Sequence, residues 1–351
     1  MSAYDVVRSE IPKAPKRWLV TGVAGFIGSN LLEELLHLDQ QVVGLDNFST
    51  GKRENLRDVQ ALVSTQQWKK FSFIEGDIRH PGTCHAACSG VDVILHQAAL
   101  GSVPRSIEDP LNCNDNNVSG QLTMLKAACD SKVKRMVYAS SSAVYGDAPG
   151  LPKVEEVCGK QLSPYAVSKM VNELYAHVFS QLYGLETVGL RYFNVFGPRQ
   201  DPDGAYAAVI PHWISALHSG ETVYINGTGE TSRDFCFIRN VVQANLLAAL
   251  TNSREAVNQV YNVALNKRTT LNELYYMLQK SMLPYCDQPH ESHPVHRDFR
   301  PGDVLHSQAD ISKAQRLLGY APTHSVAEGL EAAMGWYMKK LPCEKRVDSQ
   351  C

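Results

Sequence analysis

Tyr165 and Lys169 form the pair of side chains in this sequence best suited to moving a proton. They stand four residues apart after Pro164, which can begin a helix, so a helix would place the phenol and the ammonium on one face. Lowering the pKa of a tyrosine from about 10 to about 7 requires about 4 kcal/mol of preferential stabilisation of the phenolate. A nearby lysine supplies stabilisation of that kind. The pair predicts acid–base chemistry on a hydroxyl or carbonyl group.

Three consecutive serines follow the strand-like run Arg135–Ala139. If this strand and the helix of Tyr165 belong to one parallel sheet, the serines lie at the same edge as the phenol. We expect Ser142 to hydrogen-bond the reacting group and to relay its proton to Tyr165. Serines at a strand end also cap turns, so the run alone leaves both interpretations open.

Three glycines directly follow the first strand-like run, Arg17–Thr21, with the spacing G-x-x-G-x-x-G. Glycines let backbone N–H groups approach a pyrophosphate, and the N-terminus of the following helix adds a favourable partial charge. Asp46 ends the next strand, 18 residues after Gly28, where a carboxylate can accept hydrogen bonds from ribose hydroxyls. A tight turn and a capping aspartate are the alternatives. Together, the two features indicate a dinucleotide site.

An acid at this position repels a 2′-phosphate, so we expect NAD rather than NADP. A positively charged nicotinamide would also help to stabilise the phenolate of Tyr165. The expected NAD contacts are Gly22, Gly25, Phe26, Ile27, Gly28, Asp46, Asn47, Ser49, Thr50, Gly51, Asp77, Ile78, Gln97, Ala98 and Ala99, with Tyr165 and Lys169 at the nicotinamide.

Six runs of strand length alternate with helix-length segments, which predicts an α/β fold with a doubly wound, Rossmann-type parallel sheet. The runs are Arg17–Thr21, Gln41–Leu45, Phe71–Ile74, Val91–Leu95, Arg135–Ala139 and Thr187–Tyr192. We expect an NAD-binding domain over residues 17–195 and a smaller C-terminal substrate-binding α/β domain over 196–351. Residues 238–265 are expected to interleave with the first domain. Residues 1–16 show no periodicity, and we expect a loosely held N-terminal extension.

The composition disfavours several classes of protein. The 34 Lys plus Arg balance 36 Asp plus Glu. The net charge of −2 therefore lacks the excess of basic residues expected of a protein that binds nucleic acid. The N-terminus lacks an apolar signal core and no apolar stretch has membrane-spanning length, so we expect a cytoplasmic protein without a membrane partner. Of nine cysteines, Cys84 and Cys88 form the one close pair and lack further zinc ligands, so no metal is expected.

The glycine turn, Asp46, the serine run and the Tyr165/Lys169 pair together resemble the extended short-chain dehydrogenase/reductase family, from about Arg17 to Trp336. Three further segments are similar to those of nucleotide-sugar 4-epimerases. These segments are Arg191–Pro198, Arg233–Phe235 and Arg300–Asp303.

The resemblance implies a UDP-sugar substrate. It assigns the diphosphate to Asn194, Arg233 and Arg300, and guanidinium groups suit such bidentate contacts. It places Tyr224 over the uracil. Surface ion pairing by the arginines and packing by Tyr224 are the alternatives. The implied substrate contacts are Ser102, Arg105, Ser141, Ser142, Tyr165, Asn194, Tyr224, Arg233, Arg300, Asp303 and Ser307.

Relatives that dehydrate or decarboxylate sugar nucleotides carry acidic residues beside the active serine or threonine, and Ser141–Tyr145 has none. The resemblance therefore favours epimerisation: Tyr165 removes the 4-hydroxyl proton while NAD takes the C4 hydride, and the hydride returns to the other face of the 4-keto sugar. Galactose-type epimerases carry a tyrosine where this chain has Ser307, which leaves room for an acetamido group. A UDP-N-acetylhexosamine is thus the expected substrate, as in the similar bacterial UDP-N-acetylglucosamine 4-epimerases of polysaccharide synthesis.

Gly101 departs from the galactose-type pattern, which has a lysine there. A UDP-uronic-acid epimerase, with Arg105 or Ser102 on a C6 carboxylate, and a UDP-glucose epimerase remain alternatives. A non-catalytic NAD-sensing scaffold of the same fold is a third, which the presence of all three catalytic candidates disfavours. The resemblance also implies a homodimer formed by the helices that match Asp109–Cys129 and Pro164–Tyr183. Apolar periodicity in these helices would equally fit internal packing.

Overall fold

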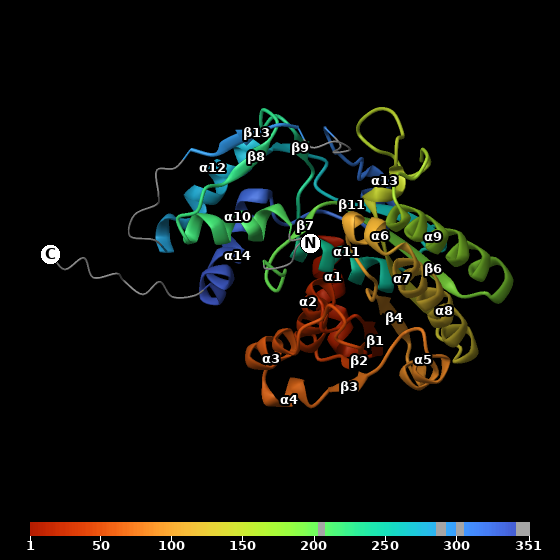
Figure 1. Ribbon diagram of the computed structural model, residues 1–351. Helices are drawn as coiled ribbons and strands as arrows, with labels where there is room; N and C mark the ends of the chain where they lie inside the picture. The colour runs from red at the N-terminus through yellow and green to blue at the C-terminus, as the bar shows by residue number, and fades with distance from the viewer. Residues whose placement is uncertain (203–207, 286–292, 300–304, 342–351) are drawn as a thin grey trace.

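Seven parallel strands form the central sheet of the computed structural model, which describes residues 1–202, 208–285, 293–299 and 305–341 (Figure 1). In spatial order they are β11 (Gln259–Val263), β6 (Glu186–Tyr192), β5 (Arg135–Ser141), β4 (Val93–His96), β1 (Arg17–Thr21), β2 (Gln41–Asp46) and β3 (Phe71–Glu75). Each predicted run is a strand of this sheet, and every neighbouring pair is parallel. The order reverses between β1 and β4, and in such sheets ligands bind outside the carboxyl ends at this point.

Helices cover both faces of the sheet, as predicted for a doubly wound fold. Val20 and Leu95 belong to one core, whereas their neighbours Leu19 and Ile94 belong to a second core on the opposite face. The helices of the first core are α2 (Phe26–His37) and α11 (Ile238–Leu250), and those of the second are α5 (Pro81–Cys88), α8 (Gly120–Asp130) and α9 (Pro164–Tyr183).

A second group of elements lies to the upper left of the sheet in Figure 1. It comprises α10 (Val209–His218), α12 (Leu271–Met282), α14 (Val326–Lys340) and the parallel pair β8 (Tyr224–Asn226) and β13 (Val295–Arg297). Trp213, Tyr275 and Leu330 join this group to the first core. The elements α11 and β11 lie with the main sheet, while the domain boundary near residue 195 stays a prediction.

Shorter elements connect these layers. They are α3 (Arg53–Leu62), α4 (Thr65–Trp68), α6 (Val103–Glu108), α7 (Pro110–Asn114), α13 (Ser312–Leu318), β7 (Val195–Phe196), β9 (Ser232–Arg233), β10 (Cys236–Phe237), β12 (Thr269–Thr270), and the 3₁₀ or π turns η1 (Ile11–Lys13), η2 (Asp115–Ser119), η3 (Ser142–Tyr145) and η4 (Leu283–Tyr285).

The N-terminal segment is not the loosely held extension expected from the sequence. Residues 3–10 form α1 (Ala3–Glu10), which begins with a capping box between Ser2 and Asp5 and packs against α11. Tyr4, Val7 and Ile11 lie against the core, and their spacing of three and four residues is a short helical period. The expectation was wrong because this period spans barely two turns.

The helices predicted to form a dimer carry exposed apolar side chains. Leu111 on α7 is 82% exposed, and Leu174 and Leu182 on α9 are 60% and 72% exposed. The homodimer itself stays a prediction. Across the part of the chain that the structure describes, no helix combines the length and the apolar content required to cross a membrane.

Candidate active site

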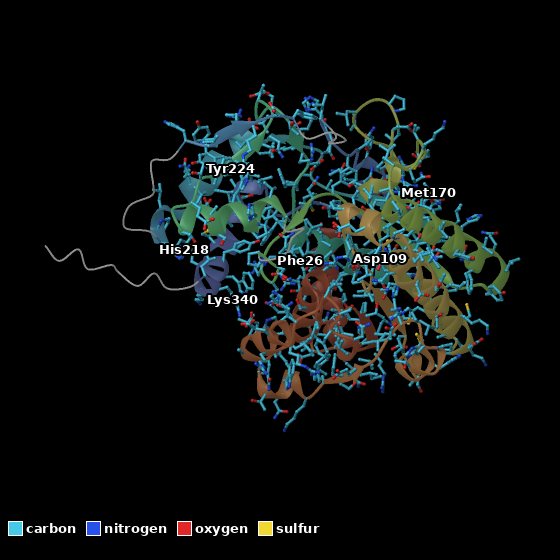
Figure 2. All side chains as sticks on the ribbon, viewed as in Figure 1. Phe26, Asp109, Met170, His218, Tyr224 and Lys340 are labelled. Atoms are coloured by element: carbon cyan, nitrogen blue, oxygen red, sulfur yellow. The ribbon has the colours of Figure 1, made fainter. Side chains whose placement is uncertain are left out.

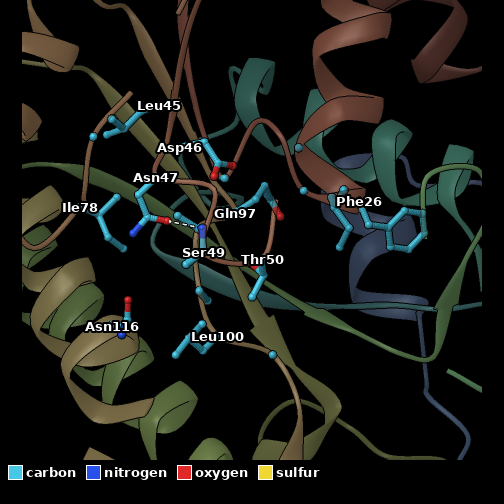
Figure 3. A pocket seen from close by; sticks show the side chains of 18 residues that line it. Phe26, Leu45, Asp46, Asn47, Ser49, Thr50, Ile78, Gln97, Leu100 and Asn116 are labelled. Carbon is cyan, nitrogen blue, oxygen red and sulfur yellow. Dashed lines mark hydrogen bonds between the residues drawn. The ribbon is translucent and has the colours of Figure 1, made fainter. Parts of the chain in front are cut away.

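A cleft of about 280 Å³ lies beside the glycine turn between β1 and α2 (Figure 3). Gly22 has a φ of +65°, and a Cβ atom there would lie 2.8 Å from the backbone N of Ala98. At Gly28 a Cβ would lie 2.1 Å from the carbonyl oxygen of Gly22. The turn and helix therefore approach each other only because these positions lack side chains. The bare backbone and the N-terminus of α2 fit the pyrophosphate of a dinucleotide.

Most of the predicted NAD contacts line this cleft. Those that do are Gly22, Gly25, Phe26, Ile27, Gly28, Asp46, Asn47, Ser49, Thr50, Ile78, Gln97, Ala98 and Ala99. The lining also includes Gly101, which the sequence singled out for its departure from the galactose-type pattern, and residues that the sequence did not indicate: Leu45, Gly76, Leu100 and Asn116. Leu100 and Gly101 simply continue the strand-end segment after Ala99. Asn116 comes from the π turn η2, for which no sequence signal was available.

Asp46 combines the two roles considered for it. Its carboxylate accepts hydrogen bonds from the backbone N–H groups of Ala24 at 2.9 Å and Phe48 at 2.8 Å, so it caps the loops around it. It also lines the cleft while being only 8% exposed. Burial raises the pKa of Asp46, and the backbone donors oppose that rise.

The structure does not bring Asp77 and Gly51 to the cleft lining. Asp77 receives two hydrogen bonds from the guanidinium of Arg79, at 3.0 and 2.8 Å, and a third from the Asn47 amide at 2.8 Å. The Arg79 bonds hold the pKa of Asp77 well below its usual range. Its oxygens are thus engaged within the protein. Gly51 instead lies against Asp46, where a Cβ atom would be 2.9 Å from both carboxylate oxygens.

A second cavity, of about 810 Å³, opens at the ends of β5 and α9. It brings together Ser102, Ser141, Ser142, Tyr165, Asn194, Arg233 and Ser307 from the predicted substrate contacts. Its wall also includes acidic and basic side chains that the sequence did not indicate, namely Glu108, Lys153 and His306. Among the described residues, no cluster of three or more side chains suited to a metal ion was found.

Four predicted substrate contacts are not among the residues that line this cavity in the described part of the chain. Arg105 and Tyr224 are not part of the cavity wall, and Arg300 and Asp303 lie outside the described residues. Tyr224 projects from β8 in the second group of elements (Figure 2). The guanidinium carbon of Arg297 lies 3.2 Å from the centre of its ring, a cation–π contact between two exposed side chains.

Tyr165 and Lys169 do lie on one face of α9, which confirms the prediction from their spacing. Ser163 caps this helix by accepting a hydrogen bond from the N–H of Ala166 at 3.1 Å. The ammonium of Lys169 lies 5.9 Å from the centre of the Tyr165 ring and donates a 2.9 Å hydrogen bond to the carbonyl of Ala139 on β5. That bond fixes the helix against the end of the strand.

Burial opposes ionisation of the Tyr165 phenol. Burial raises its pKa above 10, and a hydrogen bond with the side chain of Ser141 opposes the rise. Burial also lowers the pKa of Lys169 to about 8, so the ammonium persists at neutral pH. Ser141 and Ser142 both line the cavity with Tyr165, and the hydroxyl of Ser141 also accepts a hydrogen bond from the N–H of Ala143 at 3.1 Å. A positive charge bound beside the ring would favour the phenolate.

The glycine turn gives a direct test of the cleft. We predict that Gly28→Ala lowers the NAD content of the purified protein at least tenfold, because the new methyl group meets the Gly22 carbonyl and separates helix from turn. Gly82→Ala on α5 is the matched control, since a Cβ there has no neighbour within 4 Å. Bound NAD is measured by its release on denaturation. Wild-type NAD content in a folded Gly28→Ala protein would contradict the assignment.

Comparison with known proteins agrees with this geometry. The NAD dependent epimerase/dehydratase family matches residues 18–264. The UDP-glucose 4-epimerase of Mycolicibacterium smegmatis is 36% identical over 331 residues, which cover 92% of this chain and 99% of that protein.

Two solved structures extend the comparison. A UDP-N-acetylglucosamine 4-epimerase from Methanobrevibacter ruminantium M1, in complex with UDP-N-acetylmuramic acid, is 37% identical with a TM-score of 0.84, covering 93% of this chain and 99% of that one. A UDP-glucuronic acid 4-epimerase from Bacillus cereus, in complex with UDP-glucuronic acid and NAD, is 31% identical with a TM-score of 0.80, covering 92% and 99%. The family matches most of the length of this chain, and the glycine cleft fits the cofactor. This chain therefore belongs to the NAD-dependent epimerase/dehydratase family.

Proposed function

We propose that this protein is an NAD-dependent UDP-sugar 4-epimerase that interconverts UDP-N-acetylglucosamine and UDP-N-acetylgalactosamine. The observation that carries the proposal is that one cavity of about 810 Å³ has Tyr165 and Ser141 on its wall together with the small side chain of Ser307. The 4-epimerases among the relatives, which act on glucose, N-acetylglucosamine and glucuronic acid nucleotides, support the reaction class.

The side chains at the end of β5 and the start of α9 suit removal of a proton from a sugar hydroxyl. In this proposal Tyr165 accepts the proton of the 4-hydroxyl, and Ser141 and Ser142 hydrogen-bond the same oxygen. NAD, when bound, takes up the hydride from C4 and later returns it. The positive charge of Lys169 favours the ionised form of the Tyr165 phenol.

The reverse half of the cycle uses the same groups. The 4-keto sugar presents its other face, C4 regains the hydride, and Tyr165 returns the proton to the oxygen. The sugar gains and loses no atoms, and the cofactor ends each cycle oxidised. The turn η3 after the serines carries no carboxylate, which agrees with a reaction that expels neither water nor carbon dioxide.

The cavity wall around Ser307 supports the proposal that the substrate is an N-acetylated sugar. The N–H of Ser307 donates a 3.0 Å hydrogen bond to the carbonyl of Ser232, and the neighbouring His306 ring contacts the Ser232 hydroxyl at 2.8 Å. These bonds hold the segment at the cavity, so the space beside the serine hydroxymethyl group is a fixed property of the wall. In this proposal that space takes up the acetamido group, which a phenol at the same position would displace.

A uronic acid is a second candidate substrate because of Lys153. Its ammonium donates to the carbonyl of Ala148, and its backbone bonds to Gln308 and Asp310, close to Ser307. Burial lowers the pKa of this lysine. An ammonium on the cavity wall would favour a C6 carboxylate more than a neutral hydroxymethyl group.

Removal of the phenol tests the chemistry. We predict that Tyr165→Phe lowers kcat by about 10²- to 10⁴-fold, the usual range for loss of a general base, while NAD stays bound. Tyr183→Phe, an exposed tyrosine at the other end of α9, is the control and keeps wild-type kcat. Product formation is followed by chromatography of the UDP-sugars without added cofactor. A Tyr165→Phe protein as active as wild type would exclude Tyr165 as the base.

A substrate panel tests the sugar. Purified protein is incubated with UDP-GalNAc, UDP-glucose and UDP-GalNAcA, and we predict conversion of UDP-GalNAc to UDP-GlcNAc. Ser307→Tyr is expected to abolish that conversion and to spare UDP-glucose, whereas Ser312→Tyr, at an exposed serine, changes neither. Activity on UDP-glucose without any on UDP-GalNAc would contradict the N-acetyl assignment. Preference for UDP-GalNAcA in direct competition would favour the uronic acid.

A further inference from the structure

A buried ion pair lies directly behind the serine run. The guanidinium of Arg191 on β6 donates to both carboxylate oxygens of Glu173 on α9, at 2.9 and 2.7 Å. Arg191 is 3% exposed and Glu173 9% exposed. The proposed reaction uses neither residue.

Glu173 connects α9 to the end of the catalytic strand. It follows Tyr165 and Lys169 at intervals of four residues, so the three side chains share a helix face. The hydroxyl of Ser140, the residue before Ser141, donates a 2.5 Å hydrogen bond to Glu173. With the bond from Lys169 to Ala139, two successive strand residues are therefore fixed to two successive turns of the helix.

Arg191 extends the connection to the turn that follows the serines. It donates a 2.9 Å hydrogen bond to the carbonyl of Glu155, and its guanidinium carbon lies 4.8 Å from the centre of the Tyr145 ring. The hydroxyl of Tyr145 donates a 2.6 Å hydrogen bond to Asn262 on β11. Tyr145 also lines the sugar cavity, so Arg191 lies behind both the serines and part of the cavity wall.

A buried ion pair of this kind contributes little net stability, because the desolvation of two charges offsets their attraction. The main effect of the pair is on geometry, because two parallel hydrogen bonds between Arg191 and Glu173 allow α9 only a narrow range of positions over β6. We propose that Glu173 and Arg191 are positioning residues, which act through Ser140 to hold the phenol of Tyr165 at reacting distance from the serine hydroxyls. This inference rests on the proposed epimerase function. Misplacement of reacting groups by about 1 Å costs on the order of 100-fold in rate.

The fold supplies a matched control at the opposite end of the same two strands. Arg135 on β5 donates to Glu186 on β6 at 2.9 and 2.6 Å, and Arg135 is also buried. This pair lies at the amino ends of the strands, whereas both cavities lie at the carboxyl ends. Loss of either ion pair disturbs the sheet, but only the pair of Arg191 and Glu173 lies beside the proposed reacting groups.

The experiment compares kcat, KM, NAD content and melting temperature of the holoenzyme, with whichever UDP-sugar the wild type converts. The variants are Glu173→Gln, the double variant Glu173→Gln/Arg191→Met, Ser140→Ala and the control Arg135→Met/Glu186→Gln. Glu173→Gln should lose stability because it leaves Arg191 unpaired, and the double variant should recover much of that loss. We expect kcat to fall about 10- to 100-fold in Glu173→Gln and in the double variant, with KM within about threefold of wild type.

Ser140→Ala should lower kcat by about tenfold at a wild-type melting temperature, and the control should keep kcat within about twofold. Recovery of kcat together with stability in the double variant, or an equal loss in the control, would show that the pair is structural only and overturn the proposal. A wild type that converts no UDP-sugar would overturn the proposed function, and with it this inference. The two failures are distinguishable because the first requires an active wild type.

Discussion

The contact between the start of α9 and the end of β5 is the constraint on which the site depends. The helix carries Tyr165 and Lys169, and the strand carries the serines. The proposed chemistry requires both elements. The hydrogen bond from Lys169 to Ala139 and the bond from Ser140 to Glu173 fix the two against each other. The parallel sheet then brings the glycine turn to the same edge, because all strands end there.

Burial at this contact has opposite consequences for the two titratable groups. It raises the pKa of Tyr165, which opposes ionisation, and lowers the pKa of Lys169 to about 8, which leaves the ammonium charged at neutral pH. Burial alone therefore favours the neutral phenol and, at neutral pH, the charged ammonium. A cofactor with a positively charged ring would complete the site, so that proton removal and hydride transfer occur in the same complex.

The sequence predicted the elements whose signals are local. The strand runs, the glycine turn and the tyrosine and lysine spacing depend on neighbours within a few residues. The short helix α1 was missed because Tyr4, Val7 and Ile11 give too little periodicity. Asp77 follows β3 as expected, but the guanidinium of Arg79, two residues later, donates hydrogen bonds to its oxygens, which the local pattern did not predict.

Other features depend on the tertiary structure and had no local signal. Strand β5 continues to Ser141 and the turn η3 begins at Ser142, a boundary within the serine run that no local pattern predicted. Asn116 and Lys153 reach the two cavities from segments without strand-end character. The partners of Arg191 lie 18 and 36 residues away along the chain, at Glu173 and Glu155.

The most direct test is the pKa of Tyr165 itself. It is measured by ultraviolet difference titration of wild type against Tyr165→Phe, with NAD removed and with NAD restored. We predict that the pKa of Tyr165 lies above the usual value of a tyrosine without the cofactor and shifts toward neutrality when NAD is bound. The same pKa in both states would contradict the claim that the oxidised cofactor turns this buried phenol into a base.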